Sequence, residues 1–433
     1  MKFKIRAVFG MTLIAASASW GASPPMLAVS VRGDNAIEFY NLAGTGVYPS
    51  FAEKIPVGKN PGELCLAPDS KRLYVGLTGD KKVAVVDLEN KSVVATFGDP
   101  ALQSPDGCAV SPDSRKLYLV DQAGNAVFVF ATDSRSGAKR IEVGKEPRRV
   151  VFSPDGKRIL VSDAQSNTLT VIDPLTDKIV STVKTGNEPR DIAFSADGKL
   201  LAVSLIADDS AEIFDGQTLA FKQQVGSAWS PQHLAFAPDA QHLYVVGHVR
   251  DEIALMRVGR LTRVEWFISV PHGAVGEHQT WGFAMLPDGK YLYVSNIGDG
   301  TIGVVDPAAT HTIRTITTGK QPYSIAYIPA SGGTVGMNAA ARAAYYRTLA
   351  QKAVAGIKAG DFVGAANLCR TLEQRWDEGE SALRQNAQET WNQVDMAMDD
   401  FIHPIIRAGG KQPDSTTLDA SYQNFLAKLE LLQ

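Results

Sequence analysis

Four of the seven histidines are expected to converge with one glutamate, Glu277. His272 and His278 lie on either side of Glu277 in a segment that contains two glycines, and His233 and His248 precede it. Imidazole and carboxylate groups suit Zn, Cu, Fe or Ni, and such a metal can activate water for hydrolysis. The candidate ligands of a divalent metal are therefore His248, His272, Glu277 and His278. The competing interpretation is that these histidines are only solvated or hydrogen-bonded, because no two of them have the tight helical spacing of a zinc protease.

A second set of reactive side chains follows a recurring Gly-x-x-Pro segment, as at residues 186–189 and 319–322. The first and second residues after this proline include arginines, aromatic residues, an aspartate and a histidine. A rim of this kind suits an anionic or aromatic small ligand, or a loop of a protein partner. The candidate ligand-binding residues are Asp106, Arg148, Arg149, Arg190, His233, Trp281 and Tyr323. The alternative interpretation is that they are ordinary loop residues.

Basic residues are concentrated near two of these segments, which suggests a rim that receives anions, including a single nucleic-acid strand. Glutamates are interleaved with them, however, and the solvated ends of strands have the same composition. The formal net charge of the chain is −3, whereas nucleic-acid-binding proteins usually carry a basic excess. The charge therefore disfavours nucleic acid as a partner. The basic residues are Lys139, Arg140, Lys145, Arg148, Arg149 and Arg190, and the interleaved acids are Glu142, Glu146 and Glu188.

The elements that position these groups come from a repeat of about 42 residues. Each unit contains an apolar run, a turn such as Pro154-Asp155-Gly156 or Pro287-Asp288-Gly289, and three further short apolar runs. Proline presets the backbone of the turn, aspartate hydrogen-bonds to the local backbone, and glycine accepts the left-handed conformation. Four strands per repeat is the size of a β-propeller blade. The sequence therefore predicts an all-β propeller of four-stranded blades.

The ends of the repetitive region predict the number of blades. Six complete units run from Pro61 to Pro322, and one further strand follows at residues 323–328. Three strands near residues 27–57 match the remainder of a blade, so pairing of the two ends would close a ring of seven blades without open edges. The spacing of 49 residues between Pro238 and Pro287 exceeds the usual 42. The extra residues fall at 271–277, in a loop predicted to lie on the same face as the Gly-x-x-Pro segments, at the mouth of the central channel.

The repeats resemble the YVTN family of β-propeller proteins. The resemblance rests on Leu73-Tyr74-Val75-Gly76 and Leu292-Tyr293-Val294-Ser295-Asn296, with Gly-x-x-Pro segments leading into the next inner strand, and it covers roughly residues 27–330. It implies a propeller fold and an extracytoplasmic setting, and it does not imply a single activity because the family includes scaffolds, surface-layer proteins and partners of oxidoreductases. A Cys-x-x-Cys-His motif, which attaches c-type heme, does not occur in this sequence.

The amino terminus predicts export. Lys2, Lys4 and Arg6 precede an apolar run and then small residues, which is typical of a signal peptide cleaved near residues 18–22. We expect a periplasmic or secreted protein with no membrane-spanning segment in the mature chain. Of the three cysteines, Cys65 and Cys108 fall in neighbouring inner strands at offset positions, so small apolar fillers are favoured over a disulfide.

The composition changes after Pro329, where a glycine-rich linker is followed by helix-forming residues. Val394, Met398, Phe401 and Ile405 recur with a helical period, which predicts an α-helical bundle. The acidic residues of this region flank the apolar stripe, which is typical of a solvated helix face. The expected organisation is a signal peptide at 1–22, a seven-bladed propeller at 23–330, a linker at 331–337 and a helical bundle at 338–433.

Three functions are compatible with these features. The favoured hypothesis is a secreted or periplasmic binding or scaffold protein, non-catalytic, that presents the propeller mouth to a small ligand or an extracytoplasmic protein partner. The second is a metal-dependent hydrolase or lactonase-like enzyme with its site at the mouth. The third is an anion or single-stranded nucleic-acid binder that uses the basic rim. No catalytic residue is assigned, and a divalent metal is the one cofactor for which candidate ligands are present.

Overall fold

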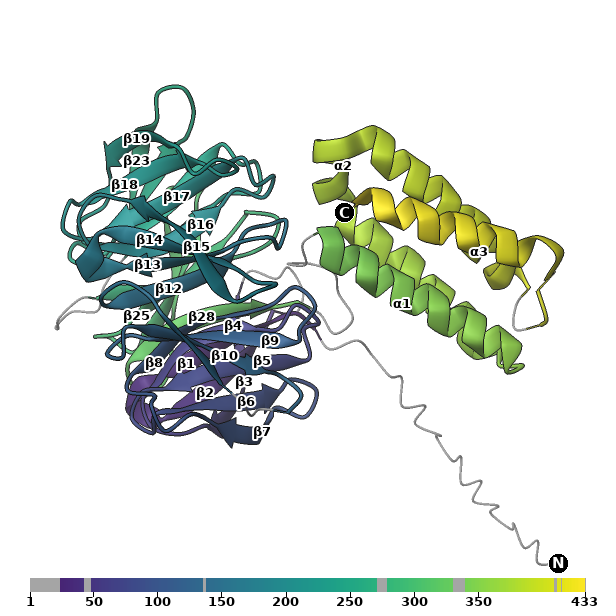
Figure 1. The fold of residues 1–433 in the computed structure, drawn as a ribbon, viewed down its shortest axis with the longest axis horizontal. Coiled ribbons are helices and arrows are strands. Elements are labelled where there is room, and N and C mark those ends of the chain that lie inside the picture. The colour runs from purple at the N-terminus through teal and green to yellow at the C-terminus, as the bar shows by residue number, and fades with distance from the viewer. Residues whose placement is uncertain are drawn as a thin grey trace, which may run out of the picture.

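The computed structural model describes residues 24–42, 48–134, 138–270, 279–329, 339–408, 411–413 and 415–432. Its strands form antiparallel four-stranded sheets that are arranged as a β-propeller, and helices follow at the carboxyl end (Figure 1). The first three sheets in chain order are β4–β7 (Pro61–Leu66, Arg72–Leu77, Lys82–Asp87, Ser92–Phe97), β8–β11 (Pro105–Val110, Lys116–Asp121, Ala126–Ala131, Lys139–Glu142) and β12–β15 (Pro147–Phe152, Ile159–Asp163, Thr168–Asp173, Lys178–Lys184).

The next sheet is β16–β19 (Pro189–Phe194, Leu200–Leu205, Ser210–Asp215, Phe221–Gly226). A single parallel pair, Ser269 with His311, joins the two four-stranded sets that follow into one eight-stranded sheet. These sets are β20–β23 (Pro231–Phe236, His242–Gly247, Glu252–Arg257, Arg263–Ser269) and β24–β27 (Thr280–Met285, Leu292–Asn296, Thr301–Asp306, His311–Thr317).

The last described sheet contains both ends of the repetitive region. Its order is β28 (Pro322–Ile328), β1 (Met26–Val31), β2 (Ala36–Asn41) and β3 (Ser50–Pro56). β1 pairs antiparallel with β28, with Leu27 opposite Tyr327 and Ala28 opposite Ala326. The innermost strand of this sheet therefore comes from the far end of the repeats.

The turn that recurs in each unit has the backbone that its residues predict. At Ser153-Pro154-Asp155-Gly156, the amide of Gly156 donates to the carbonyl of Ser153 at 2.8 Å, and Asp155 accepts from the Lys157 amide at 3.1 Å. Gly156 has a φ of +69°, and Ser70 and Ala240 adopt the same left-handed backbone where glycine is missing. The first hairpin of each unit is therefore encoded locally.

Buried apolar side chains fill the spaces between neighbouring sheets. One cluster joins Ile37 and Phe39 of one sheet to Val75 and Ala84 of the next. Buried serines add polar links between the inner strands. Ser162 accepts from the Arg149 amide of its own sheet at 3.1 Å and donates to the Arg190 carbonyl of the next at 2.6 Å, and Ser295 and Ser30 make the same kind of link. The recurring serines thus fix the spacing of the inner strands.

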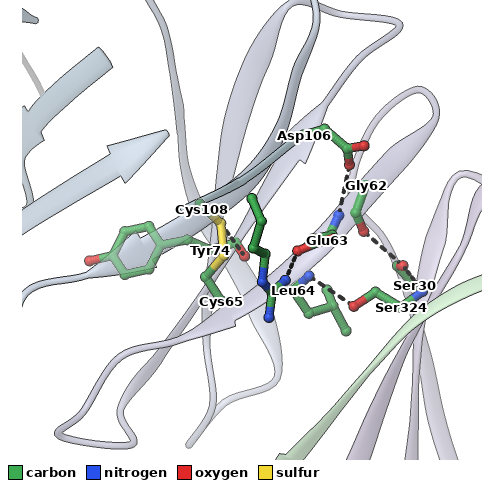
Figure 2. The surroundings of a disulfide bond; sticks show 10 residues. Ser30, Gly62, Glu63, Leu64, Cys65, Tyr74, Asp106, Cys108 and Ser324 are labelled. Carbon is green, nitrogen blue, oxygen red and sulfur yellow. Dashed lines mark hydrogen bonds and ion pairs between the residues drawn. A yellow bond between two sulfur atoms is a disulfide. The ribbon is translucent and has the colours of Figure 1, made fainter. Parts of the chain in front are cut away.

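A disulfide joins two of these inner strands, which corrects the expectation of unpaired apolar cysteines. Cys65 of β4 and Cys108 of β8 are bonded, with their Cα atoms 5.9 Å apart (Figure 2). β4 and β8 are neighbours that belong to different sheets, so no ladder of hydrogen bonds fixes their register. The offset of the two cysteines in the repeat therefore does not prevent them from meeting. Cys369, in the helical region, is a buried free thiol.

The helical region has its own apolar core. It comprises α1 (Ala339–Lys358), α2 (Phe362–Arg407), α3 (Ser415–Leu429) and the 3-10 turn η3 (Glu430–Leu432). Asp361 caps α2 by accepting from the Gly364 amide at 2.8 Å, as its position after Gly360 predicts. The core side chains, which include Trp376 and Phe401, all come from the helices. Among the described residues, no helix combines the length and apolar character needed to cross a bilayer.

Candidate functional site

Each inner strand that the structure describes begins with an irregularity in its pairing with the next strand of the sheet. In β12, Pro147 pairs with Asp163 and Val150 pairs with Val161, so the pairing register shifts between residues 147 and 150. The same shift occurs at the start of the other inner strands, for example between Pro189 and Ile192 of β16. A β-bulge of this kind re-aims side chains that strict alternation would send into the sheet packing. Arg148 and Arg149, and likewise Arg190 and Asp191, are thereby available to one central site.

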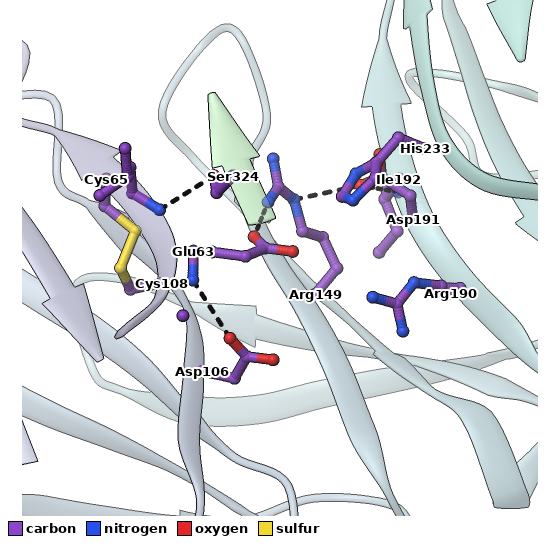
Figure 3. A network of polar contacts seen from close by, with 12 residues as sticks. Glu63, Cys65, Asp106, Cys108, Arg149, Arg190, Asp191, Ile192, His233 and Ser324 are labelled. Atoms are coloured by element: carbon purple, nitrogen blue, oxygen red, sulfur yellow. Dashed lines mark hydrogen bonds and ion pairs between the residues drawn. A yellow bond between two sulfur atoms is a disulfide. The ribbon is translucent and has the colours of Figure 1, made fainter. Parts of the chain in front are cut away.

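A chain of charged groups links four inner strands. Arg149 of β12 forms an ion pair with Glu63 of β4 through its Nη1, and its Nε lies 3.1 Å from Oδ1 of Asp191 on β16 (Figure 3). His233 of β20 lies with its Nδ1 3.2 Å from Oδ2 of Asp191, and the Leu234 amide donates to the same oxygen at 3.1 Å. Arg149 is therefore held between two carboxylates, and Asp191 is held between a guanidinium and an imidazole.

The surroundings determine the protonation states of Asp191 and His233 at neutral pH. Burial alone raises the pKa of the Asp191 carboxyl, but the charge of Arg149 and the hydrogen bond from His233 outweigh burial and lower the pKa to about 2. Burial lowers the pKa of His233 and outweighs the opposing effect of Asp191. His233 is therefore a neutral imidazole that donates from Nδ1, and Asp191 is a carboxylate.

A second group surrounds Tyr323, one of the predicted rim residues. Its hydroxyl donates to Oδ2 of Asp106 at 3.1 Å, and Oδ1 of Asp106 lies 3.4 Å from Nη2 of Arg32. The Arg32 guanidinium also covers the Tyr323 ring, with Cζ 3.2 Å from the ring centroid. Burial and the nearby Asp106 raise the pKa of Tyr323, so the phenol remains a donor. Asp106 therefore has cationic and phenolic partners within the chain.

Arg190 is the exception among the central charged groups. It is 6% exposed, no described residue accepts a hydrogen bond from its guanidinium, and no described carboxylate lies within ion-pair distance. Its Cζ lies 4.6 Å from the centroid of the Trp281 ring, which also packs against Tyr323 at 5.1 Å and against His248 at 4.9 Å. Figure 3 shows Arg190 beside Asp191 without a polar contact to the residues drawn. A buried guanidinium without an anionic partner is costly unless a ligand supplies the charge.

Most of the predicted basic cluster is engaged with acids of the chain. Arg148 pairs with Glu146, Arg140 pairs with Glu142 at 2.7 Å, and Lys139 lies 3.8 Å from Asp177. Burial and the neighbouring Arg190 charge lower the pKa of Arg148. The glutamates that are interleaved in the sequence therefore neutralise part of the cluster. Among its described members, Arg190 and Lys145 have no ion pair, and Arg190 is buried whereas Lys145 is exposed.

The predicted metal ligands are described only in part. His272, Glu277 and His278 lie outside the described residues. His248 donates from Nδ1 to the carbonyl of Thr280 at 3.1 Å, and burial lowers its pKa. Within the described ranges, no group of three or more histidine, cysteine, aspartate or glutamate residues has the arrangement of a metal site. Of the four proposed metal ligands, His248 is therefore the one that lies within the described residues.

A buried carboxyl at the edge of this region gives a prediction about stability. Asp163 accepts hydrogen bonds from Thr170 and Thr168 at one oxygen, and its Oδ1 has no partner among the described residues. Burial raises its pKa from 3.8 to about 6, so the folded state binds this proton more tightly than the unfolded state. The stabilising protonation is complete below about pH 4 and is lost as the pH rises through 6. At pH 7.5, Asp163→Asn should therefore raise the free energy of unfolding by about 1–2 kcal/mol, as measured by urea denaturation.

Asp121 provides the matched control for that substitution. It ends β9 as Asp163 ends β13, but its two oxygens accept from the amides of Ser104 and Gln103 at 2.6 and 3.0 Å. Asp121→Asn leaves one of these amides without its acceptor and should destabilise the protein. Equal effects of the two substitutions would show that burial of the Asp163 charge has no cost.

The sequence identified the positions after the Gly-x-x-Pro prolines but missed three contributors to the site. The structure places Asp106, Arg149, Arg190, His233, Trp281 and Tyr323 in contacts between inner strands, whereas Arg148 pairs with Glu146 just before its own strand. Glu63 and Asp191 stand two residues after the proline, as the predicted Arg149 and His233 do, and they were missed because only basic and imidazole side chains were singled out at that position. The sequence signal that could have identified Asp191 is the pair of consecutive polar residues directly after a proline, Arg190-Asp191. Arg32 was missed because it lies in the 3-10 turn between β1 and β2, outside the Gly-x-x-Pro segments.

Comparison with known proteins supports the propeller fold. A family model described as a YNCE-like β-propeller matches residues 114–266, and a model described as a lactonase with a seven-bladed β-propeller matches residues 215–327. A search of the curated proteins gave no significant match. Each family match covers less than half of the chain, so the chain is similar to both families.

Solved structures give the same result for the fold. A functionally unknown protein from Desulfotomaculum acetoxidans is 15% identical, with a TM-score of 0.61 over 70% of this chain and 99% of that one. A putative 6-phosphogluconolactonase from Bacteroides fragilis is 17% identical, with a TM-score of 0.59 over 71% and 98%. A periplasmic gluconolactonase from Pseudomonas aeruginosa is 17% identical, with a TM-score of 0.57 over 71% and 99%. At these identities the likeness establishes a β-propeller and no activity.

Proposed function

We propose that this chain is an exported β-propeller protein that binds a small anionic ligand at the mouth of its central channel and does not transform it. The observation that carries the proposal is the Arg190 guanidinium, which is buried against Trp281 and lacks an anionic partner among the described residues. The other central arginines, Arg32, Arg148 and Arg149, have carboxylate partners. An anion bound at Arg190 would supply the missing charge and take part in charge-assisted hydrogen bonds.

The architecture proposed for this function is a ring of seven blades. Support comes from the pairing of β1 with β28 and from the division of the eight-stranded sheet into two sets that share a single pair of residues. The inner strands also contact one another in the order β4, β8, β12, β16, β20, β24 and β28, and β28 contacts β4. A rigid ring presents a preformed concave site, which reduces the entropy lost on binding.

Export to the periplasm or the cell exterior is part of the proposal. The amino-terminal signal-like segment, the YVTN-like repeats and the Cys65–Cys108 disulfide support it, because disulfides persist in oxidising compartments. The helical region would then engage a partner or restrict access to the mouth.

Binding of simple carboxylates tests the proposed function. Ligand-observed NMR titration of the full chain with butanoate and hexanoate at pH 7 should show binding, and Arg190→Gln should weaken it at least tenfold. Arg263→Gln removes an exposed guanidinium of β23 and should leave the affinity unchanged. Thermal melting of both variants checks that they fold. The proposal would be rejected if the wild type bound neither carboxylate, or if folded Arg190→Gln bound them as tightly as the wild type.

Lactone hydrolysis is the second candidate function, because the lactonase model matches residues 215–327, which include His233, His248 and Trp281. The same protein can be assayed by pH-stat with gluconolactone, with and without a chelator. Hydrolysis faster than the uncatalysed reaction, and lost in Arg190→Gln, would favour a catalytic function over the proposed binding function. Sensitivity of that turnover to the chelator would favour a metal-dependent form of the reaction.

A further inference from the structure

Gln232 has an unsatisfied acceptor on the inner strand next to that of Arg190. It follows Pro231 in β20 as Arg190 follows Pro189 in β16, and it is 4% exposed. Its Nε2 donates to the carbonyl and to the hydroxyl of Ser230 at 3.3 and 3.2 Å, which fixes the orientation of the amide. Its Oε1 has no hydrogen-bond partner among the described residues. Buried acceptors of this kind are rare in folded proteins unless a ligand or water completes them.

The stacking of Arg190 brings it toward Gln232. β20 contacts β16 on one side and β24 on the other. Arg190 starts on β16 and reaches the Trp281 ring on β24, so its side chain extends past the start of β20, where Gln232 lies. An unpaired cationic donor and an unpaired neutral acceptor therefore occupy neighbouring positions in the same central site.

The charges around this pair select the anion. Arg148 pairs with Glu146, Arg149 lies between Glu63 and Asp191, and His233 and His248 are neutral, so the three arginines and three acids of this group balance, and Arg190 is the arginine that has no carboxylate within ion-pair distance. A ligand with a single negative charge disturbs this balance less than one with two. The planar fork of a guanidinium matches the two oxygens of a carboxylate, whereas a phosphate at neutral pH would bring close to two charges.

We propose that the ligand is a small carboxylate that also carries a hydroxyl group, with the carboxylate on Arg190 and the hydroxyl donating to Oε1 of Gln232. This inference rests on the proposed binding function. A hydroxyl fits better than an ammonium donor, because the cationic Arg190 repels a second positive charge.

A matched series of ligands tests this inference. Glycolate, 3-hydroxybutanoate and 6-hydroxyhexanoate place the hydroxyl at increasing distances from the carboxylate, and acetate, butanoate and hexanoate are their counterparts without it. Ligand-observed NMR titration of the full chain at pH 7 should show that at least one hydroxycarboxylate binds at least tenfold more tightly than its counterpart. The corresponding alcohols and inorganic phosphate should not bind. Glycine should bind more weakly than glycolate.

Substitution of Gln232 separates this inference from the proposed function. Gln232→Ala should reduce the affinity for the preferred hydroxycarboxylate to that of its counterpart and leave the counterpart unaffected, while Arg190→Gln should weaken both. Gln217→Ala, at an exposed glutamine of a peripheral turn, is the control and should change neither affinity. Equal binding of hydroxylated and plain carboxylates, or a hydroxyl preference that survives in folded Gln232→Ala, would overturn the inference while leaving anion binding at Arg190 intact. Absence of binding by every carboxylate would reject both.

Discussion

Replacement of Asp191 by asparagine is expected to lower the free energy of unfolding at pH 7 by about 3 kcal/mol, since removal of one member of a buried charge network leaves its partners uncompensated. Asp191 is 5% exposed and contacts Arg149, His233 and the Leu234 amide. An asparagine has the same shape but removes the charge that Arg149 requires. Urea denaturation of the full chain, followed by tryptophan fluorescence, measures the change.

The effect of Asp191 depends on pH in a defined direction. Its pKa is about 2 in the folded protein, against 3.8 for an unperturbed aspartate side chain, so the folded state binds the proton more weakly. The stabilisation is present above about pH 4 and is lost as the pH falls from 4 toward 2. The difference in stability between the wild type and Asp191→Asn should therefore narrow over this range.

An exposed carboxylate supplies the control for Asp191. Glu142 pairs with Arg140 on β11, and its side chain is largely exposed. Glu142→Gln should change the stability by less than about 0.5 kcal/mol at any pH between 3 and 7. A similar small change for Asp191→Asn would mean that the central charges are effectively hydrated and independent.

Reduction of the Cys65–Cys108 disulfide is expected to lower the free energy of unfolding by about 4 kcal/mol. The two cysteines are 43 residues apart, and a cross-link over a loop of this length removes entropy of that magnitude from the unfolded chain. Urea denaturation of the wild type with and without reductant measures the effect on an unchanged sequence. The two cysteines lie two residues after Glu63 on β4 and two residues after Asp106 on β8. Loss of the bond should therefore increase the mobility of both acidic side chains.

The double variant Cys65→Ala, Cys108→Ala is the control for the disulfide. It should be less stable than the oxidised wild type and should not respond to reductant, because the remaining Cys369 is a buried free thiol. A wild type that responds no more than the double variant would show that the bond does not constrain the chain.

Short-range patterns account for the parts of the fold that the sequence predicted well. The Pro-Asp turns specify their hairpins through contacts within four residues, as at Ser153 and Gly156, and they can be read without knowing what surrounds them. The helix boundary at Gly360 and Asp361 is equally local, since a left-handed residue and a capping carboxylate act on adjacent turns. By contrast, α2 extends as one helix over Phe362–Arg407, whereas the residues that recur with a clear helical period, Val394, Met398, Phe401 and Ile405, lie in its second half. Packing against α1 and α3 stabilises a helix beyond the segment whose own pattern is clear.

Turn chemistry and hydrophobic period act within a single unit, so the β-propeller repeats, the helical region and the positions from which side chains reach the centre can be read from the chain. Which charged groups meet depends instead on how the sheets are assembled. Glu63, Arg149, Asp191 and His233 come from four different repeats, and the disulfide joins two strands that share no hydrogen-bonded ladder. The pairing of a guanidinium depends on distances between strands of different sheets, and no local pattern encodes those distances. For that reason the unpaired state of Arg190 and of Gln232 among the described residues, on which the proposed ligand depends, could be found only in three dimensions.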